Sequence, residues 1–112
     1  MSETPALWEI LVPTVRNSGK PFRTRHHKVW DCRVRRVTGG LTVLSPAKGQ
    51  WVAPTGELFL ERMIPVRIVA TRKQIEQVIQ ITLQHYDQIA VLCYRISEEV
   101  ILTYRKEVNG RA

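Results

Sequence analysis

The order in which the spacing of apolar residues changes along the chain restricts its fold most strongly. Alternation with a period of two is typical of strands, and spacing of three to four residues is typical of helices. Extended segments are expected at 7–12, 41–44, 57–70, 89–96 and 100–105, and helices at 24–37 and 71–86. This order predicts an α+β fold, a ferredoxin-like βαββαβ sandwich with an extra C-terminal strand and both helices on one face of an antiparallel sheet.

Residues that begin or end elements support these boundaries. Pro13 ends the first strand, and Gly39 with Gly40 suits the left-handed position that closes a helix. Thr71 and Gln74 have the spacing of a capping box, which predicts the start of the second helix. The segment 45–56 is rich in turn-forming residues and is expected to be a long loop.

Length and composition indicate one domain. The chain has 112 residues, of which 44% are apolar, and we expect a disordered lead at 1–6, a domain at 7–105 and a polar tail at 106–112. No apolar run is long enough to cross a membrane and no secretory signal is visible, so no membrane partner is expected. Cys32 and Cys93 are expected to be reduced and partly buried, which favours a cytoplasmic protein.

The long strand at 57–70 has apolar residues on both of its faces. We expect one of these faces to pack on the helices. Phe59, Met63 and Val69 lie on the opposite face of the strand. A single chain would leave that second face uncovered, so we expect self-association into a dimer or trimer.

The positive charge is concentrated in one short segment. Residues 16–36 contain eight basic side chains and one acidic side chain, so they account for the whole net charge of +7. Such a field attracts anions to one face of a protein. The basic residues of this segment are Arg16, Lys20, Arg23, Arg25, Lys28, Arg33, Arg35 and Arg36.

Basic residues at the start of the first helix oppose the helix dipole. Arg23 and Arg25 lie where the positive end of the dipole favours acids, and Arg16 precedes them in the chain. A bound phosphate or carboxylate would relieve this repulsion, so these three arginines are candidate ligand-binding residues. The alternative is a solvated basic surface on which Asp31 pairs with Arg35.

Further candidate ligand-binding residues lie around the long strand. Arg62 interrupts an apolar face next to Glu61, and it either pairs with an acid such as Glu9 or holds an anionic ligand. Trp51 lies beside Lys48 in the expected loop, where it either packs on the sheet or covers a ligand. We therefore expect the protein to bind a small anionic ligand or a protein partner, at a site between the first helix, residues 45–56 and the long strand.

Other classes of function have weaker support. The basic segment could bind nucleic acid, but the aromatic residues of an RNA-recognition sheet are missing. His26, His27 and Cys32 lack the spacing of a metal site, so no metal and no cofactor is expected. No nucleophile with a partner base is visible, so catalytic residues are not assigned and the existence of an enzymatic activity stays open.

One group of motifs resembles a family of small uncharacterised bacterial proteins. The motifs are Gly39-Gly40-Leu41-Thr42-Val43-Leu44, Gly49-Gln50-Trp51, and Gly56-Glu57 with Glu61. The element order also resembles the trimeric ferredoxin-like proteins related to nitrogen-regulatory PII and to CutA. By analogy this implies an oligomer with a regulatory role that binds an effector at clefts between subunits. The alternatives are nucleic-acid binding through the basic helix and a small enzyme of the dimeric α+β barrel type, using Glu61 or His26.

Overall fold

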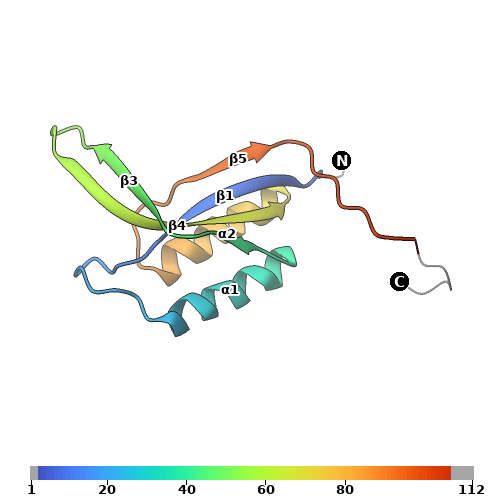
Figure 1. The fold of residues 1–112 in the computed structure, drawn as a ribbon, viewed down its shortest axis with the longest axis horizontal. Helices are drawn as coiled ribbons and strands as arrows, with labels where there is room; N and C mark the ends of the chain where they lie inside the picture. Colours follow the sequence, from blue (N-terminus) through green and yellow to red (C-terminus); the bar gives the residue numbers. More distant parts are fainter. Residues whose placement is uncertain (1–2, 107–112) are drawn as a thin grey trace.

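The computed structural model describes residues 3–106 and shows two helices on one face of an open sheet (Figure 1). The predicted α+β class, with both helices on the same side of an antiparallel sheet, is confirmed. The elements are β1 (Ala6–Pro13), α1 (Thr24–Thr38), β2 (Thr42–Val43), β3 (Ala47–Val52), β4 (Leu58–Ala70), α2 (Arg72–His85) and β5 (Cys93–Ser97).

The sheet is built around β4, its longest strand. The strand order is β2-β4-β1-β5, and β3 pairs with the same edge of β4 as β2 does. β1 pairs with β4 from Ala6 opposite Ala70 to Pro13 opposite Met63. Residues 58–62 of β4 therefore continue beyond β1 and pair only with β3. We call the hairpin formed by residues 47–62 the arm; it projects from the body of the protein (Figure 1).

Three segments differ from the prediction. The expected loop at 45–56 contains β3, because these residues pair with the projecting part of β4. The strand expected at 89–96 begins only at Cys93, and Ile89 is fully exposed. Residues 100–105 form no strand, so the fifth strand of the sheet is β3 and not a C-terminal addition. The residues of this segment favour an extended backbone, but a strand also needs a partner, and no strand in residues 3–106 pairs with it.

The ends of the predicted domain are only partly described. Ala6, expected in the disordered lead, is the first residue of β1 and is buried. Residues 1–2 of the lead and 107–112 of the polar tail lie outside the described residues.

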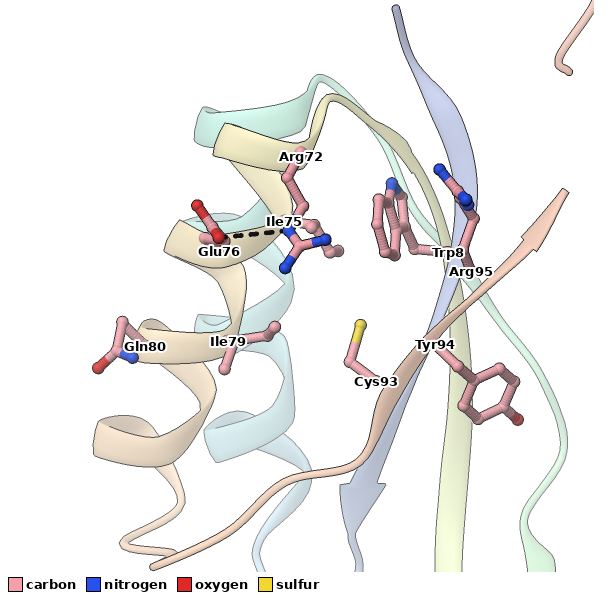
Figure 2. Close-up of a pocket in the computed structure, with 9 residues that line it drawn as sticks. All are labelled: Trp8, Arg72, Ile75, Glu76, Ile79, Gln80, Cys93, Tyr94 and Arg95. Carbon is pink, nitrogen blue, oxygen red and sulfur yellow. Dashed lines mark hydrogen bonds and ion pairs between the residues drawn. The ribbon is translucent and has the colours of Figure 1, made fainter. Parts of the chain in front are cut away.

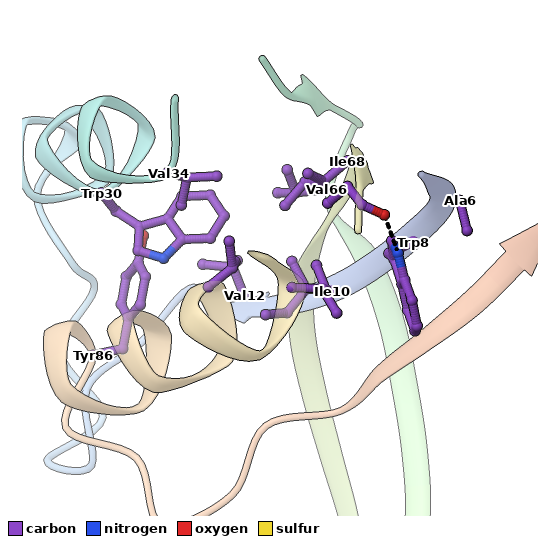
Figure 3. Packing of buried hydrophobic residues seen from close by; sticks show 12 residues of the cluster. Ala6, Trp8, Ile10, Val12, Trp30, Val34, Val66, Ile68 and Tyr86 are labelled. Atoms are coloured by element: carbon purple, nitrogen blue, oxygen red, sulfur yellow. Dashed lines mark hydrogen bonds between the residues drawn. The ribbon is translucent and has the colours of Figure 1, made fainter. Parts of the chain in front are cut away.

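The core lies between the helices and the sheet (Figure 3). Trp30 of α1 is buried against Tyr86, which follows α2, with their ring centroids 6.0 Å apart. The indole N–H of Trp30 donates to the hydroxyl of Thr82, and this hydroxyl donates to the carbonyl of Val78. Thr82 thus satisfies the one polar atom of the buried Trp30 and fixes the distance between the two helices.

The end of α1 and the start of α2 are both capped. Gly39 has a φ of 88° and closes α1, with its N–H bound to the carbonyl of Arg35. Thr71 and Gln74 form the predicted capping box at the start of α2. The Gln74 amide also donates to the carbonyl of Val37, so the same side chain joins the two helix ends.

At the opposite end of the helical layer, histidines join the start of α1 to the end of α2. The Nε2–H of His26 donates to the carbonyl of His85, and the Nε2–H of His85 donates to the carbonyl of His26. Arg33 donates to Nδ1 of His85, and the phenol of Tyr86 contacts Nδ1 of His27 at 2.6 Å. Burial raises the pKa of Tyr86, so this phenol stays protonated and donates to a neutral His27. We call these five residues the histidine clamp.

Replacing Thr71 with alanine should destabilise the protein by about 1 kcal/mol, because the first turn of α2 loses its side-chain acceptor. Thr71→Ala and the control Thr55→Ala, in an exposed turn, are compared by urea unfolding. Equal unfolding midpoints for the two variants would contradict a stabilising role for the capping box.

The histidine clamp should make stability depend on pH. Burial lowers the pKa of His27 and of His85 below the ordinary value of 6.5, and the neighbouring His26 lowers the pKa of His27 further. As the pH falls below about 6.5, the unfolded chain therefore binds protons before the folded chain does. The stabilisation is complete above that pH and is lost below it.

The measurement is the free energy of unfolding of the wild type and of His27→Gln/His85→Gln between pH 7.5 and 5.5. The wild type should lose stability over this range, and the double variant should lose less. The same pH dependence in both proteins would show that other groups cause the loss.

Candidate anion-binding site

Three of the predicted ligand-binding residues lie together at the start of α1. Arg23 is the N-cap residue, Arg25 is in the first turn, and both side chains are exposed. The guanidinium of Arg16 lies over the ring of Phe22, 5.6 Å from its centroid. Phe22 in turn stacks on His26. The loop before α1 thus places Arg16 beside the first turn of the helix.

The first turn of α1 lacks the capping found at α2. Arg23 makes no side-chain cap bond, and the turn contains no acidic residue. Within residues 3–106, the backbone N–H groups of Thr24 and Arg25 have no acceptor. Unsatisfied N–H groups and the helix dipole together favour an anion at this position.

The rest of the basic segment does not neutralise this charge. In the described part of the chain, none of its eight basic side chains takes part in an ion pair. Asp31 and Arg35 do not form the ion pair that was expected for a solvated basic surface. Burial raises the pKa of Asp31, and the charge of Arg35 partly opposes this rise. No ion pair within residues 3–106 therefore neutralises the positive charge along α1.

The other four predicted residues lie on the arm and are divided between its two faces. Lys48 pairs directly with Arg62, and Gly49 pairs with Glu61. Alternation along β4 places Arg62 on the side that bears the helices, since the buried Val66 has the same parity. Lys48 shares that face with Arg62, whereas Glu61 lies on the opposite face.

Trp51 lies on the same face of the arm as Glu61. Its ring stacks on Phe59, with the ring centroids 4.6 Å apart and the planes at 15°, and its side chain is half exposed. Trp51 belongs to β3 and not to a loop, so it does not fold over the start of α1. The single site predicted from the sequence is thus divided into a helix-side group and a group on the other face.

The backbone connects the helix-side group to the loop before α1. The hydroxyl of Thr14 donates to the carbonyl of Arg62 at 2.7 Å. The side chain of Arg62 is exposed, because this part of β4 lies beyond β1. Because the charge of Arg62 stays in contact with water, this arginine does not need an acidic partner such as the expected Glu9.

Glu9 instead pairs with another arginine on the open face of the sheet. Arg67 donates to Glu9 at 3.0 Å and Tyr94 donates to the other carboxylate oxygen, so one polar row crosses β4, β1 and β5. The hydrogen bond from Tyr94 is the largest cause that lowers the pKa of Glu9. The open face of the sheet therefore has this polar row at its centre, with apolar side chains around it. From Phe59, Met63 and Val69 the sequence had predicted an apolar face without such a row.

A groove that the sequence did not reveal lies between α2 and β5 (Figure 2). Its volume is about 530 Å³. The ring of Trp8 lies between the guanidinium groups of Arg72 and Arg95, 6.0 and 5.9 Å from its centroid. Burial raises the pKa of the Cys93 thiol to about 11, so this thiol is protonated at neutral pH. The feature that could have indicated this groove is Arg95, which lies directly opposite Trp8 in the sheet. That pairing is known only once the register of the strands is known.

The residues considered for other functions do not form a reactive centre. His26 is held in the histidine clamp, and Glu61 is exposed on the arm, so neither lies in a dry cleft. Among residues 3–106 no group of three His, Cys, Asp or Glu side chains is arranged to hold a metal ion. No helix in the same range is long and apolar enough to span a membrane.

Comparison with known proteins supports the fold. No protein-family model matches the chain, and no curated protein matches it in sequence. Solved structures do match. The chain resembles CutA, a periplasmic divalent cation tolerance protein of Archaeoglobus fulgidus, with a TM-score of 0.65 and 10% identity over 88% of each chain. It resembles CutA1, a divalent ion tolerance protein of Ehrlichia chaffeensis, with a TM-score of 0.62 and 8% identity over 91% of this chain and 88% of that one.

A phage SAM lyase in complex with S-methyl-5'-thioadenosine also matches. Its TM-score is 0.61 at 11% identity, covering 91% of this chain and 96% of that one. At such low identities the likeness concerns the fold alone. The chain therefore has the ferredoxin-like fold of CutA and PII type, as the element order predicted.

Proposed function

We propose that the protein binds a small anion bearing phosphate or carboxylate groups at the start of α1. The observation that carries this proposal is the contrast between the two helices. α2 begins with a complete capping box, whereas the first N–H groups of α1 have no acceptor within residues 3–106. Arg23 and Arg25 lie at the same helix start, and Arg16 lies against the neighbouring Phe22. An anion would accept hydrogen bonds from these N–H groups and would screen the repulsion between the arginines.

The arm extends the proposed site on one face only. Lys48 and Arg62 lie on the helix side of the sheet, and Thr14 ties the backbone of Arg62 to the loop that carries Arg16. These two cations are thus connected through the backbone to the chain segment that leads to α1. Trp51 and Glu61 lie on the other face and are not part of this proposed site.

The chemistry favours a small ligand over a nucleic acid. A free helix N-terminus presents its N–H groups to one phosphate or carboxylate at a time. The stacked pair Trp51 and Phe59 lies on the opposite face from Lys48 and Arg62, so bases stacked there would not place their phosphates on those cations.

Replacing Arg23 and Arg25 with glutamine should weaken the binding of pyrophosphate by about tenfold or more, because each charged hydrogen bond contributes about 1.5–3 kcal/mol. The control is Arg35→Gln/Arg36→Gln, which removes the same charge from the other end of α1. Binding is measured by calorimetry at constant ionic strength and by the ligand-dependent rise in melting temperature.

The wild type and the control should bind alike. Equal weakening in both variants, together with a steep salt dependence for a single-stranded oligonucleotide, would favour a polyanion along the whole helix. No binding of pyrophosphate, inorganic phosphate or citrate to the wild type would overturn the proposal.

A further inference from the structure

The groove between α2 and β5 has the size of a small-molecule site. Its volume of about 530 Å³ lies within the range of about 300–1,000 Å³ that is usual for such sites. It follows α2 from Arg72 to Gln80, a length of about 12 Å at the rise of an α-helix. The start of α1 lies beside the opposite end of α2, so this groove is separate from the proposed anion site.

One wall of the groove is apolar. Ile75 and Ile79 lie one turn apart on α2, and Cys93 of β5 faces Ile79 across the groove (Figure 2). Trp8 closes the wall, and its ring is fixed by a hydrogen bond from its N–H to the carbonyl of Ala70. Burial raises the pKa of the Cys93 thiol, so no charge interrupts this wall at neutral pH. Ile79 and Cys93 are only half-buried, which leaves apolar surface for a ligand to cover.

The positive charge of the groove lies at one end, where α2 begins. The guanidinium groups of Arg72 and Arg95 lie on either side of the Trp8 ring (Figure 2). Glu76 is the one acidic residue among those that line the groove, so the lining has a net positive charge. The positive end of the α2 dipole lies at the same place, and the first turn of this helix contains no acid. This end of the groove therefore favours an anionic group.

The ion pairs of the two arginines leave donors free. Arg72 donates to Glu76 through Nε at 3.2 Å, and Arg95 donates to Glu98 through one terminal nitrogen at 2.9 Å. Both pairs are exposed, so each contributes little to stability. Within residues 3–106 the two terminal nitrogens of Arg72 make no hydrogen bond. Because a guanidinium binds a carboxylate through two parallel N–H groups, Arg72 can still hold one.

We propose that this groove binds a free amphipathic monocarboxylate, a straight-chain acid of medium length. Its carboxylate accepts hydrogen bonds from Arg72, and its alkyl chain follows the wall formed by Ile79 and Cys93. The arrangement favours one charge followed by an apolar chain, because the cations lie at one end and the apolar side chains continue along α2. A polyphosphate fits less well, since its charges would extend along the apolar wall.

The first experiment compares chain length and head-group charge on the full chain. Calorimetry measures the binding of hexanoate, octanoate and octylamine at constant ionic strength. Each methylene that the groove buries should tighten binding about fourfold, which corresponds to about 0.8 kcal/mol. Octylamine has the same chain as octanoate but a positive head group, so it should bind at least about tenfold more weakly. Equal affinities for hexanoate and octanoate, or for octanoate and octylamine, would overturn the proposal.

The second experiment tests the carboxylate partner. Arg72→Gln should weaken octanoate binding about tenfold or more, because charged hydrogen bonds to the carboxylate are lost. The matched control is Lys73→Gln, which removes the same charge from the next residue; Lys73 is exposed and does not line the groove. Circular dichroism checks that both variants fold. The control should bind octanoate like the wild type, and an equal loss in both variants would contradict the assignment to Arg72.

The thiol of Cys93 provides a measurement of where the acid binds. In the variant Cys32→Ser, Cys93 is the one remaining cysteine of the chain. Its reaction with iodoacetamide should slow severalfold in saturating octanoate, because the alkyl chain covers the thiol. Pyrophosphate, the probe of the start of α1, should leave the rate unchanged. A rate that octanoate does not change would show that the acid binds elsewhere and would overturn the proposal.

The groove and the anion site can be tested independently of each other. Arg23→Gln/Arg25→Gln should bind octanoate as tightly as the wild type, because neither arginine lines the groove. A loss of octanoate binding in this variant would assign the carboxylate to the start of α1 and would overturn the groove proposal alone. A wild type that binds neither acid would also overturn it, whatever the result with pyrophosphate.

Discussion

The mismatch in length between β4 and β1 shapes the rest of the molecule. β1 has 8 residues and β4 has 13, so β1 supports only the part of β4 that lies over the helices. Pairing on the other edge changes from β2 to β3 around Pro65, which has no N–H to donate. The remaining part of β4 must leave the body, and β3 follows it. The arm is thus a consequence of strand length and not an independent module.

The two ends of the helical layer are stabilised by different chemistry. At one end, the capping box of α2 and Gly39 satisfy backbone groups with neutral side chains and a turn. At the other end, the histidine clamp holds the helices together, but the first N–H groups of α1 find no acceptor in the described residues 3–106. Cations and free donors therefore accumulate at one end only, which is the asymmetry on which the proposed anion site depends.

The sequence predicted the elements that local patterns define. The helix boundaries, the capping box and the fold class followed from periodicity and from Thr71, Gln74 and Gly39. Of the site residues, Arg23 and Arg25 lie at the start of α1 and Arg16 lies against the ring of Phe22 just before it, as their closeness in the chain requires. Their role as a ligand site stays a prediction.

Features that depend on strand register could not be predicted. Glu9 pairs with Arg67 and not with Arg62, because residue 9 of β1 lies opposite residue 67 of β4. The sequence alone does not give this register. The reciprocal bonds between His26 and His85 join residues far apart in the chain, and no local pattern indicates them. Turn-forming residues around β3 suggested a loop, because a strand that pairs only with a projecting segment has no strong periodicity of its own.

The arm carries part of the positive charge that the anion proposal uses. Lys48 lies on β3 and pairs directly with Arg62 of β4. The hydroxyl of Thr14 donates to the carbonyl of Arg62, and Thr14 lies in the chain segment that leads to α1. The part of β4 that continues beyond β1 is therefore joined to that segment through the backbone, whereas Arg16, Arg23 and Arg25 belong to the segment and to α1 themselves.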